Sequence, residues 1–224
     1  MIVHHEDKEI YINASVVKVP QANREYILSQ GNETVDSYFI SLQFLLAGPL
    51  ENTVDDFWLM VYQQNSSTVV MLCNCIEMNR DKSWQYWPLE VGHTMVLGES
   101  REGMGLEVTM VSSEDRGHYI IRTFTLTNTM TGEKRKIKQF HYMNWPDFNV
   151  PKSPDQFLEF LLEVRKSNCF LDSCGPPIGE CSIVVKRCFT RLTVFFFIYS
   201  ISMYCSCFSP LFCWEWKVRN SDLG

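Results

Sequence analysis

Three segments rich in β-branched and aromatic residues follow one another between Leu106 and Tyr142, and they constrain the fold most. "LEVTMVSSE" (Leu106–Glu114) and "YIIRTFTLTN" (Tyr119–Asn128) are typical of strands. A turn is expected at Thr131–Gly132, followed by another strand. Two more strands are predicted at Tyr26–Gln30 and Ser67–Cys73. Together these segments predict a β-sheet.

Two segments predict helices. In Asn52–Gln64, Asn52 or Thr53 can cap the helix, acidic residues follow in the first turn, and apolar residues recur at helical spacing. In Ser153–Ser167, Ser153 is the expected cap and Pro154 suits the first helical position. The apolar face of this second helix comprises Phe157, Phe160, Leu161 and Val164. The expected fold class is α+β, a mixed sheet flanked by helices.

Composition limits the classes of function. The chain has 224 residues and a net charge of −6, which suits one domain, or one domain with a tail, and argues against nucleic-acid binding. The short basic run Gly132–Lys138 is expected to form a solvated hairpin turn. The charged N-terminus does not resemble a secretory signal, so the nine cysteines are expected to be reduced thiols in the cytoplasm. Cys73–Cys75 and Cys205–Cys207 each lack a matching second pair, so no metal site is expected.

Two segments do not fit a sheet flanked by helices. Asn32–Gly48 lies between a predicted strand and a predicted helix, has no turn chemistry, and is apolar in its second half. The other segment begins near Gly179, and its residues Leu192–Trp214 include no charged side chain. A segment of that length is long enough to cross a bilayer core of ~30 Å, so membrane association through this tail is an alternative interpretation.

Five motifs occur in an order that points to a family: "YINAS" (Tyr11–Ser15), "YILSQG" (Tyr26–Gly31), "FWLMVYQQ" (Phe57–Gln64), "QYWP" (Gln85–Pro88) and "FHYMNWPDFNVPKSP" (Phe140–Pro154). Together they resemble the catalytic domain of tyrosine-specific protein phosphatases, in the subgroup of the non-receptor type 1 and T-cell enzymes. The resemblance covers Tyr11–Gly31 and Gly48–Ile178. It implies a highly twisted mixed sheet flanked by helices, phosphotyrosine proteins as partners, and hydrolysis through a cysteinyl-phosphate intermediate. It implies neither a cofactor nor a metal.

The resemblance also implies roles for individual residues. Asp147 matches the general acid that protonates the leaving tyrosine oxygen and then activates water. Trp145 would anchor the hinge of a closing loop, Phe148 would form an aromatic wall for the substrate ring, and Pro146 would be a substrate-binding or supporting residue. Glu77 and Lys82 match a loop that braces the phosphate-binding arginine and the acid. A turn aspartate at Asp147, and a solvated charged loop around Glu77 and Lys82, are the alternative readings.

The nucleophile region departs from the family pattern. Cys181 falls at the nucleophile position and Arg187 at the position of the arginine that grips the phosphate. Ile183–Lys186 replace the small and glycine residues that let backbone N–H groups converge on an anion. Val184 and Val185 favour an extended strand instead. We therefore expect hydrolysis to be weak or absent, with Cys181 and Arg187 as unrelated residues of an altered tail.

These expectations define a partial phosphatase domain at residues 1–178, an aberrant insertion at 32–48, and a divergent hydrophobic tail at 179–224. Our hypothesis for the insertion and the tail is translation of retained introns, or an error in the gene model. The fold is expected to be incomplete at both ends, to lack one core strand, and to leave part of its apolar sheet surface uncovered, which favours aggregation. The alternative functions are a non-catalytic binding fragment and a membrane-tethered form.

Overall fold

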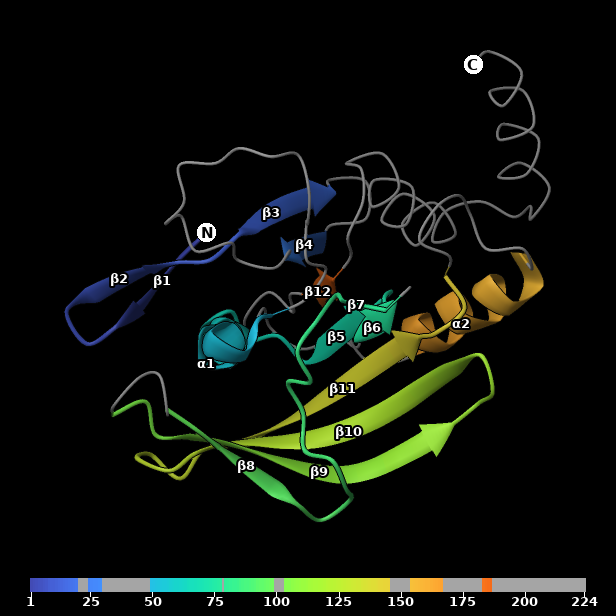
Figure 1. Cartoon of the computed structure of the whole chain (residues 1–224). Helices are drawn as coiled ribbons and strands as arrows, with labels where there is room; N and C mark the ends of the chain where they lie inside the picture. Colours follow the sequence, from blue (N-terminus) through green and yellow to red (C-terminus); the bar gives the residue numbers. More distant parts are fainter. Residues whose placement is uncertain are drawn as a thin grey trace.

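Figure 1 shows a computed structural model of the chain, which describes residues 1–19, 24–29, 49–77, 79–98, 103–145, 154–166 and 183–186. Eight strands form one sheet in the order β3-β4-β12-β5-β11-β10-β9-β8. In chain order these are β3 (Ala14–Val19), β4 (Arg24–Ser29), β5 (Thr68–Met71), β8 (Thr94–Leu97), β9 (Leu106–Asp115), β10 (Tyr119–Asn128), β11 (Lys134–Tyr142) and β12 (Ile183–Lys186). Two hairpins pair β1 (Ile2–His5) with β2 (Lys8–Tyr11), and β6 (Ile76–Glu77) with β7 (Arg80–Asp81).

The sheet is mixed, as the sequence predicted. Strands β4, β12, β5 and β11 run parallel to one another. β3 pairs with β4 in antiparallel fashion, and so do the successive pairs of the run β11-β10-β9-β8. The helices are α1 (Val54–Gln63), which a 3₁₀ turn at Glu51–Thr53 precedes, and α2 (Pro154–Lys166). The long strands β9 and β10 agree closely with the predicted segments, because their alternating pattern and bounding turns are local signals.

The turn chemistry agrees with the prediction at one position and differs at another. Gly132 has a φ of +73°, a conformation that favours glycine, and it closes the turn between β10 and β11. Thr53 occupies the N-cap of α1, but its side chain makes no capping bond to the helix. Its hydroxyl accepts the Leu50 N–H at 2.9 Å instead and stabilises the preceding 3₁₀ turn. The basic run also differs, because Lys134–Lys138 belong to strand β11 rather than to a turn.

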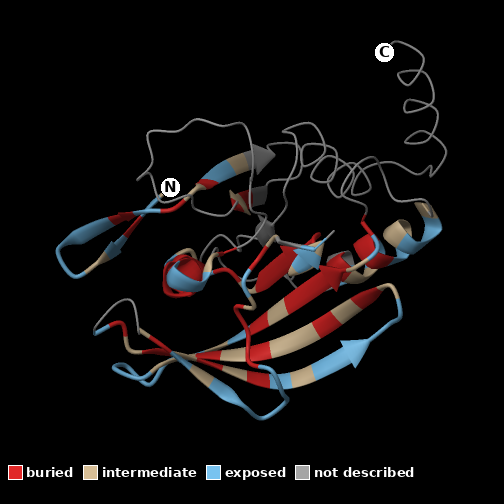
Figure 2. Ribbon diagram, in the orientation of Figure 1, coloured by how far each residue is buried: buried red, intermediate tan, exposed pale blue. Residues whose placement is uncertain are grey.

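Buried residues run through the strands of the sheet (Figure 2). Their side chains form one cluster on each face. Successive strand residues point to opposite faces, so Val69 and Met71 belong to the cluster around α1, while Val70 and Leu72 belong to the cluster around α2. The predicted apolar face of α2 is confirmed: Phe160, Leu161 and Val164 are buried, and Phe157 packs against them. The two helices therefore cover opposite faces of the sheet.

One expectation about the sheet is wrong. The strand that was expected to be missing from the core is present, because β12 lies between β4 and β5. Its residues Ile183 and Lys186 pair with Tyr26 and Ser29 on one side and with Thr68 and Met71 on the other. A β-branched run suits such a central parallel strand. The segment predicted as a tail thus contributes a strand to the domain.

Some predicted segments fall outside the described residues. These are the insertion Asn32–Gly48, the helix cap Ser153, and the hydrophobic stretch Leu192–Trp214. Within the described ranges, neither helix is long and apolar enough to cross a membrane.

Candidate active site

The candidate site lies at the edge of the sheet where the parallel strands end. Because β4, β12, β5 and β11 run in the same direction, their last residues Ser29, Lys186, Met71 and Tyr142 meet at one edge. In sheets of this kind, ligands bind beyond the carboxyl ends of the strands. Two loops leave this edge in the described structure: the one after β5 carries Glu77 and Lys82, and the one after β11 carries Trp145.

The loop after β5 is held by its own hydrogen bonds. The Glu77 Oε1 atom accepts the backbone N–H of Asn74 at 2.8 Å. The carbonyl oxygen of Cys75 accepts the N–H of Lys82 at 2.7 Å and that of Ser83 at 3.2 Å. Glu77 therefore closes a turn, and Lys82 lies where the β6–β7 hairpin returns to the sheet.

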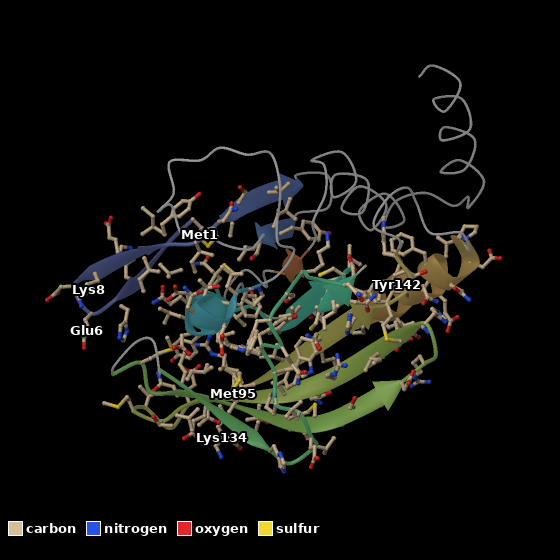
Figure 3. All side chains as sticks on the ribbon, in the orientation of Figure 1. Met1, Glu6, Lys8, Met95, Lys134 and Tyr142 are labelled. Carbon is tan, nitrogen blue, oxygen red and sulfur yellow. The ribbon has the colours of Figure 1, made fainter. Side chains whose placement is uncertain are left out.

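The segment after β11 is anchored before it reaches the predicted acid. The Met143 N–H donates to the His118 carbonyl at 3.1 Å, and the Met143 carbonyl accepts from Asn74 Nδ2 at 3.1 Å. Trp145 is 8% exposed, and its ring centroid lies 4.9 Å from that of Phe157 on α2. Figure 3 labels Tyr142, the last residue of β11, close to α2. Pro146, Asp147 and Phe148 lie outside the described residues.

A buried polar cluster supports this edge, and the sequence motifs did not reveal it. Arg122 donates to Gln139 Oε1 at 2.9 Å and lies 3.3 Å from His141 Nδ1. Gln139 Nε2 donates to the Tyr86 hydroxyl at 2.7 Å. The Arg122 guanidinium also stacks 4.7 Å above the Trp87 ring. Polar side chains at alternate positions of the otherwise apolar end of β11 were the available signal.

Burial shifts the protonation of this cluster. Desolvation, with the nearby Arg122 charge as a smaller cause, lowers the pKa of His141 from 6.5 to about 4. Burial also lowers the pKa of Arg122 and raises that of Tyr86. His141 is therefore neutral near pH 7, and it accepts from Arg122 while its Nε2–H donates to the Cys73 carbonyl at 2.9 Å. The cluster therefore joins β10, β11 and the segment that follows β5.

The nucleophile region is described only in part. Cys181 and Arg187 lie outside the described residues, and Ile183–Lys186 between them form β12. A strand of four residues separates its first and last Cα atoms by about 10 Å, at ~3.3 Å per residue. In the sequence, Cys181 precedes the amino end of β12, and Arg187 follows the carboxyl end directly. No group of three or more His, Cys, Asp or Glu side chains that could hold a metal occurs in the described part of the chain.

Comparison with known proteins defines the class to which this fold and site belong. The family model described as "Protein-tyrosine phosphatase" matches residues 1–204, so the chain belongs to the protein-tyrosine phosphatase family. Among individual proteins, it is 41% identical over 177 residues to the tyrosine-protein phosphatase non-receptor type 2 of Mus musculus. It is 37% identical over 215 residues to the tyrosine-protein phosphatase non-receptor type 61F of Drosophila melanogaster.

These alignments cover most of this chain but a minor part of each relative. The match to the mouse protein covers 79% of this chain and 38% of the relative, and the match to the fly protein covers 96% and 35%. The human receptor-type tyrosine-protein phosphatase H is 35% identical over 195 residues, which is 86% of this chain and 15% of the relative. The chain therefore spans well under half the length of these relatives.

Proposed function

We propose that this chain is a protein-tyrosine phosphatase domain in which hydrolysis of phosphotyrosine in proteins is impaired or lost. The observation that carries the proposal is the strand conformation of Ile183–Lys186, which lie between the predicted nucleophile Cys181 and the predicted phosphate ligand Arg187. These four residues pair with β4 and β5 on both sides. Their backbone N–H groups are therefore engaged along the sheet.

The chemistry explains why a strand at this place opposes catalysis. A cysteine attacks phosphorus as its thiolate, so its pKa must be lowered by a positive environment. Backbone N–H groups that converge on the phosphate supply that environment and hold the anion. Convergence needs a curled backbone, whereas successive N–H groups of a strand point in opposite directions. Glu180, the sequence neighbour of Cys181, adds a negative charge that disfavours a thiolate at that position.

The remaining proposed roles follow the family resemblance. Asp147 serves as general acid, Phe148 lines the ring of the substrate, Trp145 anchors the hinge, and Pro146 supports the site. The buried packing of Trp145 against Phe157 supports the hinge role. Glu77 and Lys82 brace the site from the loop after β5, and the hydrogen bond from Asn74 to Glu77 supports that role.

Hydrolysis of a phosphotyrosine peptide tests the proposal. Purified chain, Cys181→Ser and Asp147→Asn variants should release phosphate at indistinguishable rates near background. Turnover that disappears in Cys181→Ser would contradict the proposal and establish a working nucleophile. Turnover that survives Cys181→Ser but disappears in Cys188→Ser would contradict it too, and would assign the nucleophile to the sequence that follows β12.

Binding of the same peptide separates impaired catalysis from loss of the whole site. We expect no preference for the phosphorylated peptide over its unphosphorylated form, because the backbone N–H groups of Ile183–Lys186 pair along the sheet and do not converge on an anion. Binding without turnover corresponds to a non-catalytic recognition domain. Equal binding of both peptides would contradict a retained phosphotyrosine site.

A further inference from the structure

We propose that Asn74 is a positioning residue that fixes the start of the Asp147 segment against the loop that carries Glu77. The inference rests on the proposed function only in taking Asp147 as the general acid. The structural link stands on described contacts: one side chain and its own backbone N–H join two loops that leave neighbouring parallel strands.

Met143 is the residue at which this link acts. Both of its backbone groups are held, the N–H by the His118 carbonyl at 3.1 Å and the carbonyl by Asn74 Nδ2 at 3.1 Å. The two partners come from different parts of the sheet, the turn between β9 and β10 and the loop after β5. Met143 thus has a fixed peptide orientation only four positions before Asp147.

Asn74 can act as an anchor because Glu77 holds it in turn. The Asn74 N–H donates to Glu77 Oε1 at 2.8 Å, which fixes the backbone from which the amide side chain projects. Met143 offers only a carbonyl to Asn74, so the position requires a donor. A carboxylate there would face that carbonyl and also lie close to Glu77, and both contacts would be repulsive.

The consequence for chemistry is specific. A general acid works only within hydrogen-bond reach of the leaving oxygen, so a freer Met143 would misplace Asp147 relative to that oxygen. Attack on phosphorus does not use the acid. The defect should therefore depend on how much the leaving group needs a proton.

Backbone hydrogen exchange on the full chain tests the link without any need for turnover. In Asn74→Ala, the Met143 amide, which donates to the His118 carbonyl, should exchange about threefold to tenfold faster, the range expected for one lost hydrogen bond, and Asn74→Asp should show a larger change. Glu77→Gln keeps an acceptor and should stay near the parent, whereas Glu77→Ala should resemble Asn74→Ala. Thr94→Ala, which removes an exposed hydroxyl contact to Thr109 at the far edge strand β8, is the matched control.

The exchange of β9 amides serves as an internal reference for global stability. Unchanged exchange of the Met143 amide in Asn74→Ala would overturn the inference, and so would an equal increase across β9. If the chain hydrolyses aryl phosphates, Asn74→Ala should slow the hydrolysis of phenyl phosphate more than that of nitrophenyl phosphate. An equal loss of rate on both substrates would count against the inference. An absence of turnover would test the proposed function alone, because the exchange measurement still decides the role of Asn74.

Discussion

The Nε2 atom of His141 lies 2.9 Å from the carbonyl oxygen of Cys73 and joins the end of β11 to the end of β5. Both strands are parallel, and His141 pairs with Met71, two residues before Cys73. His141 faces Arg122 of β10 through its other ring nitrogen. A neutral imidazole, accepting at one nitrogen and donating at the other, satisfies both contacts.

This arrangement predicts acid sensitivity of the fold. The pKa of His141 is lowered to about 4 from 6.5, so the unfolded chain binds more protons than the folded chain between these pH values. The free energy of unfolding should therefore fall as the pH drops below about 6.5, by a total of about 3 kcal/mol on reaching pH 4. Urea unfolding at several pH values measures the slope. His141→Gln should flatten it, and an unchanged slope would show that other groups cause the acid sensitivity.

The buried indole of Trp58 should contribute strongly to stability. Trp58 is 0% exposed, and its Nε1–H donates to the Tyr86 carbonyl at 2.7 Å. Trp58→Phe leaves that buried carbonyl without its donor and should cost about 1–3 kcal/mol in denaturant unfolding. Trp84→Phe is the matched control, because Trp84 is 50% exposed and should change stability by less than about 0.5 kcal/mol. Equal effects would contradict the burial assigned to Trp58.

Docking of α2 should depend on Phe160. This side chain is fully buried and packs against Tyr119 and Tyr142, with ring centroids 5.5 Å and 5.1 Å away. Phe160→Ala should destabilise the fold by about 3–5 kcal/mol through lost contacts and an internal cavity. Leu162→Ala on the exposed side of the same helix should be nearly neutral, within about 0.5 kcal/mol. A similar loss in both variants would contradict the exposed position assigned to Leu162, because alanine is the stronger helix former at both positions.

Asn32–Gly48 should be dispensable for the fold. We propose that these residues interrupt the domain, since β4 ends at Ser29 and the described structure resumes at Pro49, whose carbonyl accepts the Trp84 N–H at 2.7 Å. Deleting 32–48 should leave thermal stability unchanged or raise it slightly, because a shorter connection costs less closure entropy. A large drop in the melting temperature would assign the segment a structural role.

Local patterns in the sequence were enough to predict the long elements. β9, β10 and α2 follow from alternation, turn residues and a proline at the first helical position, all of which act within a few residues. The place of β12 was not predictable in this way. Its four residues show strand propensity, but their insertion between β4 and β5 depends on pairing with residues over a hundred positions away.

Sequence motifs suggested candidate site residues, but they did not predict which side chains contact one another. Trp145, Glu77 and Lys82 were identified from their motifs, and all three follow the ends of parallel strands: Glu77 in β6 and Lys82 after β7 come after β5, and Trp145 comes after β11. The roles of Asn74, Arg122 and His141 were missed, because they arise from the register between β5, β10 and β11. A single polar residue in a strand does not indicate which residue of a neighbouring strand it will contact.

The strand at Ile183–Lys186 is the central claim, and amide exchange tests it most directly. Residue-resolved exchange should protect Val184 and Val185 as strongly as their partners Val69 and Val70 in β5. Val184→Pro should abolish cooperative unfolding, because a central strand cannot accommodate a missing N–H. Exchange of Val184 and Val185 at the rate of an exposed loop, with Val69 and Val70 still protected, would contradict the account.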